Sequence, residues 1–190
     1  MFTDADSTVK GSLIWLLDRC KTAFGRRLLR RWVGRPLTDV DMLCARGDAV
    51  QALVDAGSHP VTLKIPSLLQ GLPDLEKGLA RMSYGRAEPT ELATVLLSLN
   101  RIAFDIEPVD EPEDLGMPSS VLNDAVAALP KARSCVKAAL DAISLKQARA
   151  NEKTELFVDP DMYPELQDLK SQIAIYDVSR VAMQARPPAD

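Results

Sequence analysis

The residues best suited to chemistry lie in one short stretch near the amino terminus. Seven Lys or Arg residues and no acid fall between Arg19 and Arg35. Three of them lie in a helix predicted over 22–33 and a fourth lies just beyond its end: Arg26, Arg27, Arg30 and Arg35. A guanidinium group holds its N–H donors in a fixed fork, which suits phosphate and carboxylate oxygens. The segment therefore needs an acidic neighbour, an anionic partner or free solvent around it.

Two interpretations of this basic face stay open from the residues alone. In the first, the face contacts DNA or RNA phosphate, or an acidic surface of another domain. In the second, it is a solvated face whose arginine stems cover the core. The run Asp105–Asp114 holds six acids and offers a partner within the chain, which weakens the nucleic-acid interpretation. No aromatic residues alternate with the basic ones, so we predict no stacking platform for single strands.

The sequence predicts no catalytic residue, no bound cofactor and no metal. His59 is the single histidine, and the nearness of Ser58 and Asp55 in sequence does not make it a general base. The motifs GxxxxGK[ST], GxGxxG after a strand, HExxH and GxSxG do not occur. One histidine and three scattered cysteines supply too few ligands for zinc. We therefore expect that the chain is not an enzyme by itself.

Composition and termini favour an intracellular protein. The 190 residues are 46% apolar and 26% charged, which fits one domain or one elongated helical module. The net charge of -4 argues against nucleic-acid binding over the whole surface. No signal peptide and no membrane span are predicted. The chain has three cysteines, an odd number, and we expect each to be a buried or half-buried thiol in a reducing compartment: Cys20, Cys44 and Cys135.

Helical periodicity and scarce strand signals predict an all-α fold of about eight helices. Thr22 is expected to cap the helix over 22–33, Gly25 to mark a close-packing point, and Pro36 to end it. Thr38 is expected to cap the next helix, whose predicted inner stripe is Val40, Leu43, Cys44, Gly47, Val50 and Val54. Further helices are predicted at 61–69, 74–84, 89–104, 118–129, 130–145 and 160–184, with a strand or turn at 155–158.

The chain is expected to divide where its composition changes. Residues 1–10 are polar and loose, and 11–104 form a helical region. Residues 105–117 are an acidic, Pro-rich connector that we expect to be extended and solvated, and 118–186 return to helix. Trp15 and Trp32 lie on apolar stripes, so we expect both in the core rather than as anchors for a partner.

The segment GSLIWLLDRCKTAFGRRLLRRWVGRPL resembles the start of the core, or lever, domain of MutS-family DNA mismatch-repair proteins. The matching residues are Ser12, Leu13, Trp15, Leu17, Asp18, Thr22, Gly25, Arg27, Leu29, Trp32, Pro36 and Leu37, with Cys20 where a Thr is common. Three further blocks follow in the family's order: ARGDAVQAL, GLPDLEKGLARMSYGRAEPTEL and YPELQDLK. The RRxVGRPL form and the acidic insertion resemble the eukaryotic MutS homologue 3 type, which handles insertion–deletion loops.

The resemblance implies a function for the whole protein of which this chain looks like a part. It implies a lever that relays changes between an ATPase and a DNA clamp, with 118–186 leading to the clamp. It also implies a nuclear, ATP-dependent heterodimer with a MutS homologue 2 type, bound to mispaired or looped DNA. ATP and magnesium are implied only for an ATPase domain outside this sequence. Arg26, Arg27, Arg30 and Arg35 would face other domains or the junction of the lever.

The departures from the family pattern limit what the chain does alone. Gly47 stands where the family has a large apolar residue, and an unfilled hole there would cost about 2–5 kcal/mol. The mismatch-reading and ATPase domains are missing from the sequence, so we expect a fragment that neither reads mismatches nor hydrolyses ATP. The alternative is a free-standing helical interaction module whose basic helix docks an acidic protein partner. A small enzyme is a third alternative, which the missing site residues disfavour.

Overall fold

The computed structural model describes residues 10–55, 59–153, 155–159, 165, 168–169 and 171–176. Over these ranges the chain is helical and contains no strand, which confirms the predicted all-α class. Their single β-pairing is an isolated antiparallel bridge between Ile143 and Phe157, within the segment predicted as a strand or turn. No helix in this part of the chain is long and apolar enough to cross a membrane.

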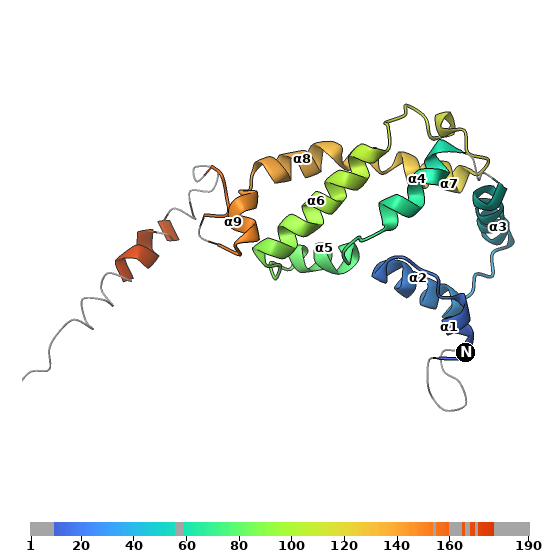
Figure 1. The fold of residues 1–190 in the computed structure, drawn as a ribbon, viewed down its shortest axis with the longest axis horizontal. Helices are drawn as coiled ribbons and strands as arrows, with labels where there is room; N and C mark the ends of the chain where they lie inside the picture. Colours follow the sequence, from blue (N-terminus) through green and yellow to red (C-terminus); the bar gives the residue numbers. More distant parts are fainter. Residues whose placement is uncertain are drawn as a thin grey trace, which may run out of the picture.

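Nine α-helices and two 3-10 turns make up an elongated arrangement in the part of the chain that the structure describes (Figure 1). The α-helices are α1 Leu13–Leu17, α2 Ala23–Gly34, α3 Val40–Asp55, α4 Pro60–Leu69, α5 Leu75–Ser83, α6 Pro89–Asp105, α7 Ser120–Ala127, α8 Arg133–Asp141 and α9 Leu145–Arg149. The 3-10 turns are η1 Pro112–Leu115 and η2 Pro130–Ala132. Helices α1 to α3 lie at one end, and the helical residues 171–176 lie at the other.

The longest helix, α6, is the centre of the packing. It contacts α4, α5, α8 and α9, and its Val95 and Ala103 are almost completely buried. Pro89 begins it, as the sequence predicts, because a helix's first residue needs no N–H donor. Arg133 of α8 closes its other end, donating to the carbonyl oxygens of Ala103 at 2.8 Å and Ile106 at 2.7 Å. These bonds satisfy carbonyls that a helix end leaves without an intrahelical partner.

A small apolar core follows α6 and lies under the acidic segment. Leu68, Ile106, Met117 and Val126 form it, with Val61, Leu115, Leu122 and Leu129 packed around them. Asn123 is buried and holds Met117 at both backbone atoms, accepting from its N–H and donating to its carbonyl. The expectation of an extended, solvated run over 105–114 is met only in part: its six acids are exposed, but the run is anchored and partly folded. Ile106 anchors this run in the core, and η1 folds its end into a capped turn.

Helix α3 packs through its alanines, contrary to the predicted stripe. Ala49 and Ala52 are buried and α3 contacts α7, whereas the residues predicted to face inward are all exposed: Val40, Leu43, Cys44, Gly47, Val50 and Val54. Small side chains let two helices approach closely, so the alanine face makes the contact. Gly47 is exposed and a Cβ built on it meets nothing within 4 Å, so this position faces open space and not a packed interior. Asp39, not Thr38, caps α3 by accepting from the Met42 N–H at 3.0 Å.

The helix predicted over 160–184 falls largely outside the described residues. Residues 165, 168–169 and 171–176 are helical, as expected, whereas the remaining positions of that range cannot be compared. Leu169, Ile173 and Tyr176 lie in these helical residues, and all three are more than half exposed. The prediction of loose structure over 1–10 concerns residues 1–9, which also lie outside the described ranges.

Candidate functional site at the junction of α2, α5 and α6

Helix α2 begins as the sequence predicts, with Thr22 as its N-cap. The Thr22 hydroxyl oxygen accepts from the Gly25 N–H at 3.1 Å. A Cβ on Gly25 would stand 2.8 Å from that oxygen, so Gly25 is a close-packing point against its own cap. The helix ends before Pro36, where the Arg35 N–H donates to the Arg31 carbonyl at 2.8 Å. These local bonds fix the direction in which the arginines of α2 project.

Arg27 joins α2 to α5 through two carboxylates, a contact that we call the Arg27 bridge. Its two terminal nitrogens donate to the two oxygens of Asp74, each at 2.6 Å. Its Nε and one terminal nitrogen also reach Glu76, at 2.9 and 2.6 Å. A planar fork on a carboxylate gives both energy and fixed geometry. The guanidinium is about half exposed, so solvent and salt screen the bridge.

Asp74 has two roles in this junction. It is the N-cap of α5, at the start of the helix predicted over 74–84, and accepts from the Lys77 N–H at 3.2 Å. Its hydrogen bonds from Arg27, with help from the Lys77 N–H, lower the pKa of Asp74 to about 2. The same pairing raises the pKa of Arg27. Both charges are therefore fully present at neutral pH, and the N-terminal end of α5 favours the carboxylates of Asp74 and Glu76.

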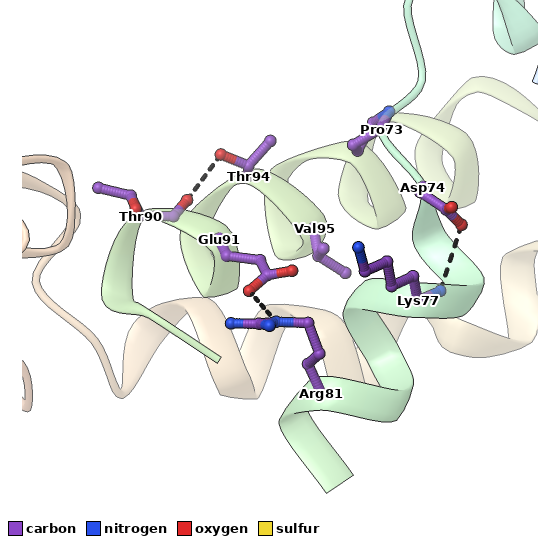
Figure 2. Close-up of a pocket in the computed structure, with 8 residues that line it drawn as sticks. All are labelled: Pro73, Asp74, Lys77, Arg81, Thr90, Glu91, Thr94 and Val95. Carbon is purple, nitrogen blue, oxygen red and sulfur yellow. Dashed lines mark hydrogen bonds and ion pairs between the residues drawn. The ribbon is translucent and has the colours of Figure 1, made fainter. Parts of the chain in front are cut away.

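A charged depression of about 530 Å³ opens beside the bridge, between α5 and α6 (Figure 2). Its walls are Pro73, Asp74, Lys77, Arg81, Thr90, Glu91, Thr94 and Val95. Arg81 donates through its Nε to Glu91 at 2.6 Å and through a terminal nitrogen to the Arg86 carbonyl at 2.7 Å, so it is tied to the Glu91 end of α6 and to the loop before it. Lys77 is exposed, and its ammonium group has no described partner. The depression holds balanced charges and resembles a contact surface more than a reaction site.

The other predicted arginines are placed differently. Arg26 pairs with Asp18 at 2.8 Å, and Arg30 lines the same cavity of about 340 Å³ as these two residues. Arg30 and Arg35 have no ion pair with any residue in the described ranges. The partners of the basic face are thus Asp18, Asp74 and Glu76. The acidic run over 105–114, which the sequence suggested, makes no described ion pair with it.

The prediction that both tryptophans are core residues is wrong. Trp15 is 50% exposed and Trp32 is 44% exposed. Arg46 of α3 lies over the Trp32 ring, 3.9 Å from its centre, which is a cation–π contact. Of the remaining signature residues, Asp18 accepts from the Cys20 N–H at 3.2 Å, and Leu37 is half-buried beyond Pro36. The apolar spacing of a tryptophan predicts that its side chain contacts other apolar groups. The spacing does not show whether those groups belong to the core of the same chain or to another molecule.

Sequence reasoning missed the residues that complete the junction. The sequence places Asp74 at the start of a predicted helix, but it assigns neither Asp74 nor Glu76 to Arg27, which lies 47 positions before Asp74. The excess of arginine on α2 was the only signal that distant acids were needed. Cys20 is half-buried as expected, whereas Cys44 and Cys135 are exposed, contrary to the prediction. His59 caps α4, its Nδ1 accepting from the Val61 N–H at 3.3 Å.

Within the described part of the chain, no group of three or more His, Cys, Asp or Glu residues could hold a metal ion. At the junction, the ion pairs of Arg27 with Asp74 and Glu76 attach helix α2 to helix α5. These ion pairs are partly exposed to solvent. The arginines without partners offer additional hydrogen-bond donors to an anionic group.

Comparison with known proteins shows the family of this chain. The family model MutS domain III matches residues 2–182. The DNA mismatch repair protein MSH3 of Mycosarcoma maydis is 52% identical over 175 residues, covering 92% of this chain and 15% of the relative. Proteins of the same name from Cryptococcus neoformans and Pyricularia oryzae are 44% and 43% identical, covering 91% and 81% of this chain and 14% of each relative. The chain thus spans about one seventh of the relatives' length, and it belongs to the MutS family, where it matches domain III of MSH3-type DNA mismatch repair proteins.

Proposed function

We propose that this chain is the lever region of an MSH3-type protein and relays rigid-body shifts between an ATPase and a DNA clamp. The observation that carries the proposal is the Arg27 bridge, which ties α2 to the α5–α6 packing unit. A relay needs helices that move as one body and contacts that have two discrete arrangements. The apolar packing around α6 supports the first requirement. For the second, we propose that the exposed Arg27 bridge is the contact that opens and closes.

The setting that we propose follows from family membership. The full-length protein acts in the nucleus as an ATP-dependent heterodimer with a MutS homologue of the second type. Its substrate is duplex DNA with mispaired bases or insertion–deletion loops. We assign ATP and magnesium to a separate ATPase domain, and no cofactor to the residues of this chain.

The relay is tested by reversing charges in a full-length MSH3 relative that carries the Arg27, Asp74 and Glu76 set. Arg27→Glu places three like charges together and should reduce ATP-induced clamp closure on looped DNA by about tenfold or more, a coupling change of about 1.4 kcal/mol. Closure is measured by energy transfer between dyes on the lever and the clamp. Adding Asp74→Lys and Glu76→Lys to Arg27→Glu restores opposite charges and should recover closure.

Two controls accompany this test. Arg149→Glu, at an exposed position of α9, makes the same charge change away from the bridge and should leave closure unchanged. Binding of looped DNA without ATP, measured alongside, separates a relay defect from a loss of folding. Normal closure in Arg27→Glu would show that the bridge takes no part in transmission.

A further inference from the structure

Helix α1 exposes an unusual amount of apolar surface for five residues. Leu13, Trp15, Leu16 and Leu17 are each about half exposed, whereas Ile14 is buried and holds the helix in place. One indole face and three leucine side chains therefore meet solvent beside the basic helix α2. Such a cluster is typical of a contact surface, because tryptophan is a frequent anchor of binding.

Arginines border this apolar surface. Trp15, Arg19, Arg26 and Arg30 line one cavity of about 340 Å³, together with Ile14 and Asp18. We call this group and the exposed leucines of α1 the Trp15–Arg30 surface. Arg26 and Arg30 are one helical turn apart, so both project from the same face of α2. Arg19 and Arg30 form no ion pair with a residue in the described ranges.

The charge of the cavity favours a carboxylate group. Three arginines and a single acid line the cavity, and the acid, Asp18, forms an ion pair with Arg26, with 2.8 Å between the Asp18 Oδ2 and the Arg26 Nε. This pair shows that a carboxylate fits against one arginine of the cavity. Arg19 and Arg30 are exposed and form no ion pair within the described ranges, so their guanidinium groups are open to a carboxylate of a docked segment.

The surroundings disfavour nucleic acid as the occupant. Phosphate backbones bind extended positive surfaces, whereas this chain carries a net charge of -4. Leucine side chains on α1 would gain nothing from a phosphate backbone, but they would bury area against apolar side chains. A segment in which acidic residues alternate with large apolar residues would contact both the arginines of the cavity and the apolar side chains of α1.

We propose that the Trp15–Arg30 surface docks a short acidic and apolar segment of a second protein chain. An acidic side chain of the segment enters the cavity and accepts from Arg30 and Arg19. Its apolar side chains lie on Trp15 and the leucines of α1. The Arg27 bridge lies outside this surface, so docking does not depend on the proposed relay.

The test measures binding of a fluorescein-labelled synthetic peptide in which Glu alternates with Leu and Phe. Fluorescence anisotropy follows its titration with the 190-residue chain, without ATP or DNA. We expect saturable binding that weakens with added salt. Arg30→Glu and Trp15→Ala should each weaken it by about tenfold or more, the size of one hydrogen bond to a charged group or one anchor. Arg149→Glu on α9 is the matched control and should bind as the unaltered chain does.

Further variants and a second peptide test whether the surface binds the acidic side chains of the peptide. Arg30→Gln keeps the side chain's length, loses its charge and should also weaken binding, while circular dichroism verifies that each variant is folded. Replacing every Glu of the peptide by Gln should abolish binding. The proposal fails if the peptide does not bind, or if Arg30→Glu and Trp15→Ala leave binding unchanged. It also fails if duplex DNA displaces the peptide with the same dependence on Arg30.

The source of the segment is decided with a full-length MSH3 relative. Binding of the peptide to that protein, with the same loss in Arg30→Glu, supports a segment from a second chain. Binding to the 190-residue chain alone would show that the relative's own polypeptide covers the surface, which overturns this assignment. Neither result bears on clamp closure, so the docking proposal and the relay proposal fail separately.

Discussion

Arg27 and Arg30 are neighbours on α2, yet they differ in what they can contribute. Arg27 has all its partners within the chain, four hydrogen bonds to two carboxylates. Arg30 has no ion pair within the described ranges and faces a cavity beside Trp15. The first arginine therefore holds helices together, whereas the second makes no ion pair within the described residues and is the one to which we assign docking.

The Arg27 bridge predicts how the chain responds to acid. Because the pKa of Asp74 falls from 3.8 to about 2 on folding, its contribution to stability is fully present above pH 3.8. This contribution is lost as the pH falls from 3.8 towards 2, when the carboxylate takes up a proton. We therefore expect the thermal midpoint to fall as the pH is lowered below 3.8. Circular dichroism between pH 5 and pH 2.5 measures this fall, because the range begins about one pKa unit above the ordinary value of Asp74.

Asp74→Asn is the matched variant for this prediction. Asparagine keeps the cap on the Lys77 N–H but carries no charge, so it removes the ion pair alone. The variant should be less stable at pH 5 and should lose less of its stability on acidification. An acid transition identical to that of the unaltered chain would show that Asp74 does not carry it.

At the scale of elements, the contact between α5 and α6 depends on a missing side chain. A Cβ on Gly78 would stand 2.5 Å from Cγ2 of Val95, which is itself almost completely buried. Gly78 is buried in α5 although glycine weakens a helix interior. The close approach of the two helices accounts for its presence, and it places Arg81 beside Glu91 and Lys77 beside Val95 of α6 (Figure 2).

We predict opposite effects for two Gly→Ala substitutions in helices. Gly78→Ala should lower the free energy of unfolding by about 1–3 kcal/mol, because the methyl group forces α5 away from Val95. Gly47→Ala meets no atom within 4 Å and should raise it by about 0.5–1 kcal/mol. Urea unfolding measures both. Equal effects at the two positions would contradict the packing described for α5 and α6.

Local signals allowed many element boundaries to be predicted, whereas packing faces were harder. Thr22, Asp74 and Pro89 start their helices as expected, because caps and first-turn prolines act within a few residues. The inward face of α3 was wrong since hydropathy ranks valine above alanine, and only the α7 contact shows that the alanines are used. The pairing of Arg27 with Asp74 depends on how distant helices meet, which no local pattern specifies.

At the scale of the whole molecule, much apolar surface faces solvent. Val40, Leu43, Val50 and Val54 of α3 are exposed, as are the leucines of α1. Apolar surface of this extent in one chain is typical of a piece that works in contact with other parts. This agrees with a chain that spans about 15% of its Mycosarcoma maydis relative.

The exposed face of α3 predicts that the 190-residue chain associates at high concentration. Val50→Lys with Val54→Lys should reduce this association, seen as a lower apparent mass in light scattering. Gln51→Lys, also exposed on α3, adds charge outside the valine face and is the control. Association that falls equally with Gln51→Lys would trace the effect to net charge and not to the valines.

The contact of Arg133 with the end of α6 and the Arg27 bridge between α2 and α5 would respond differently to mechanical load. Arg133 grips the end of α6 by two backbone carbonyls, and its guanidinium lies 4.8 Å from the centre of the Phe104 ring. Sliding α8 would break this sheltered contact and strip the apolar surface around it. Lifting α2 would break carboxylate contacts that water can replace at once. A pull along the long axis would therefore release the amino-terminal helices first and leave the α6–α8 pair intact, giving the molecule a soft end and a stiff end.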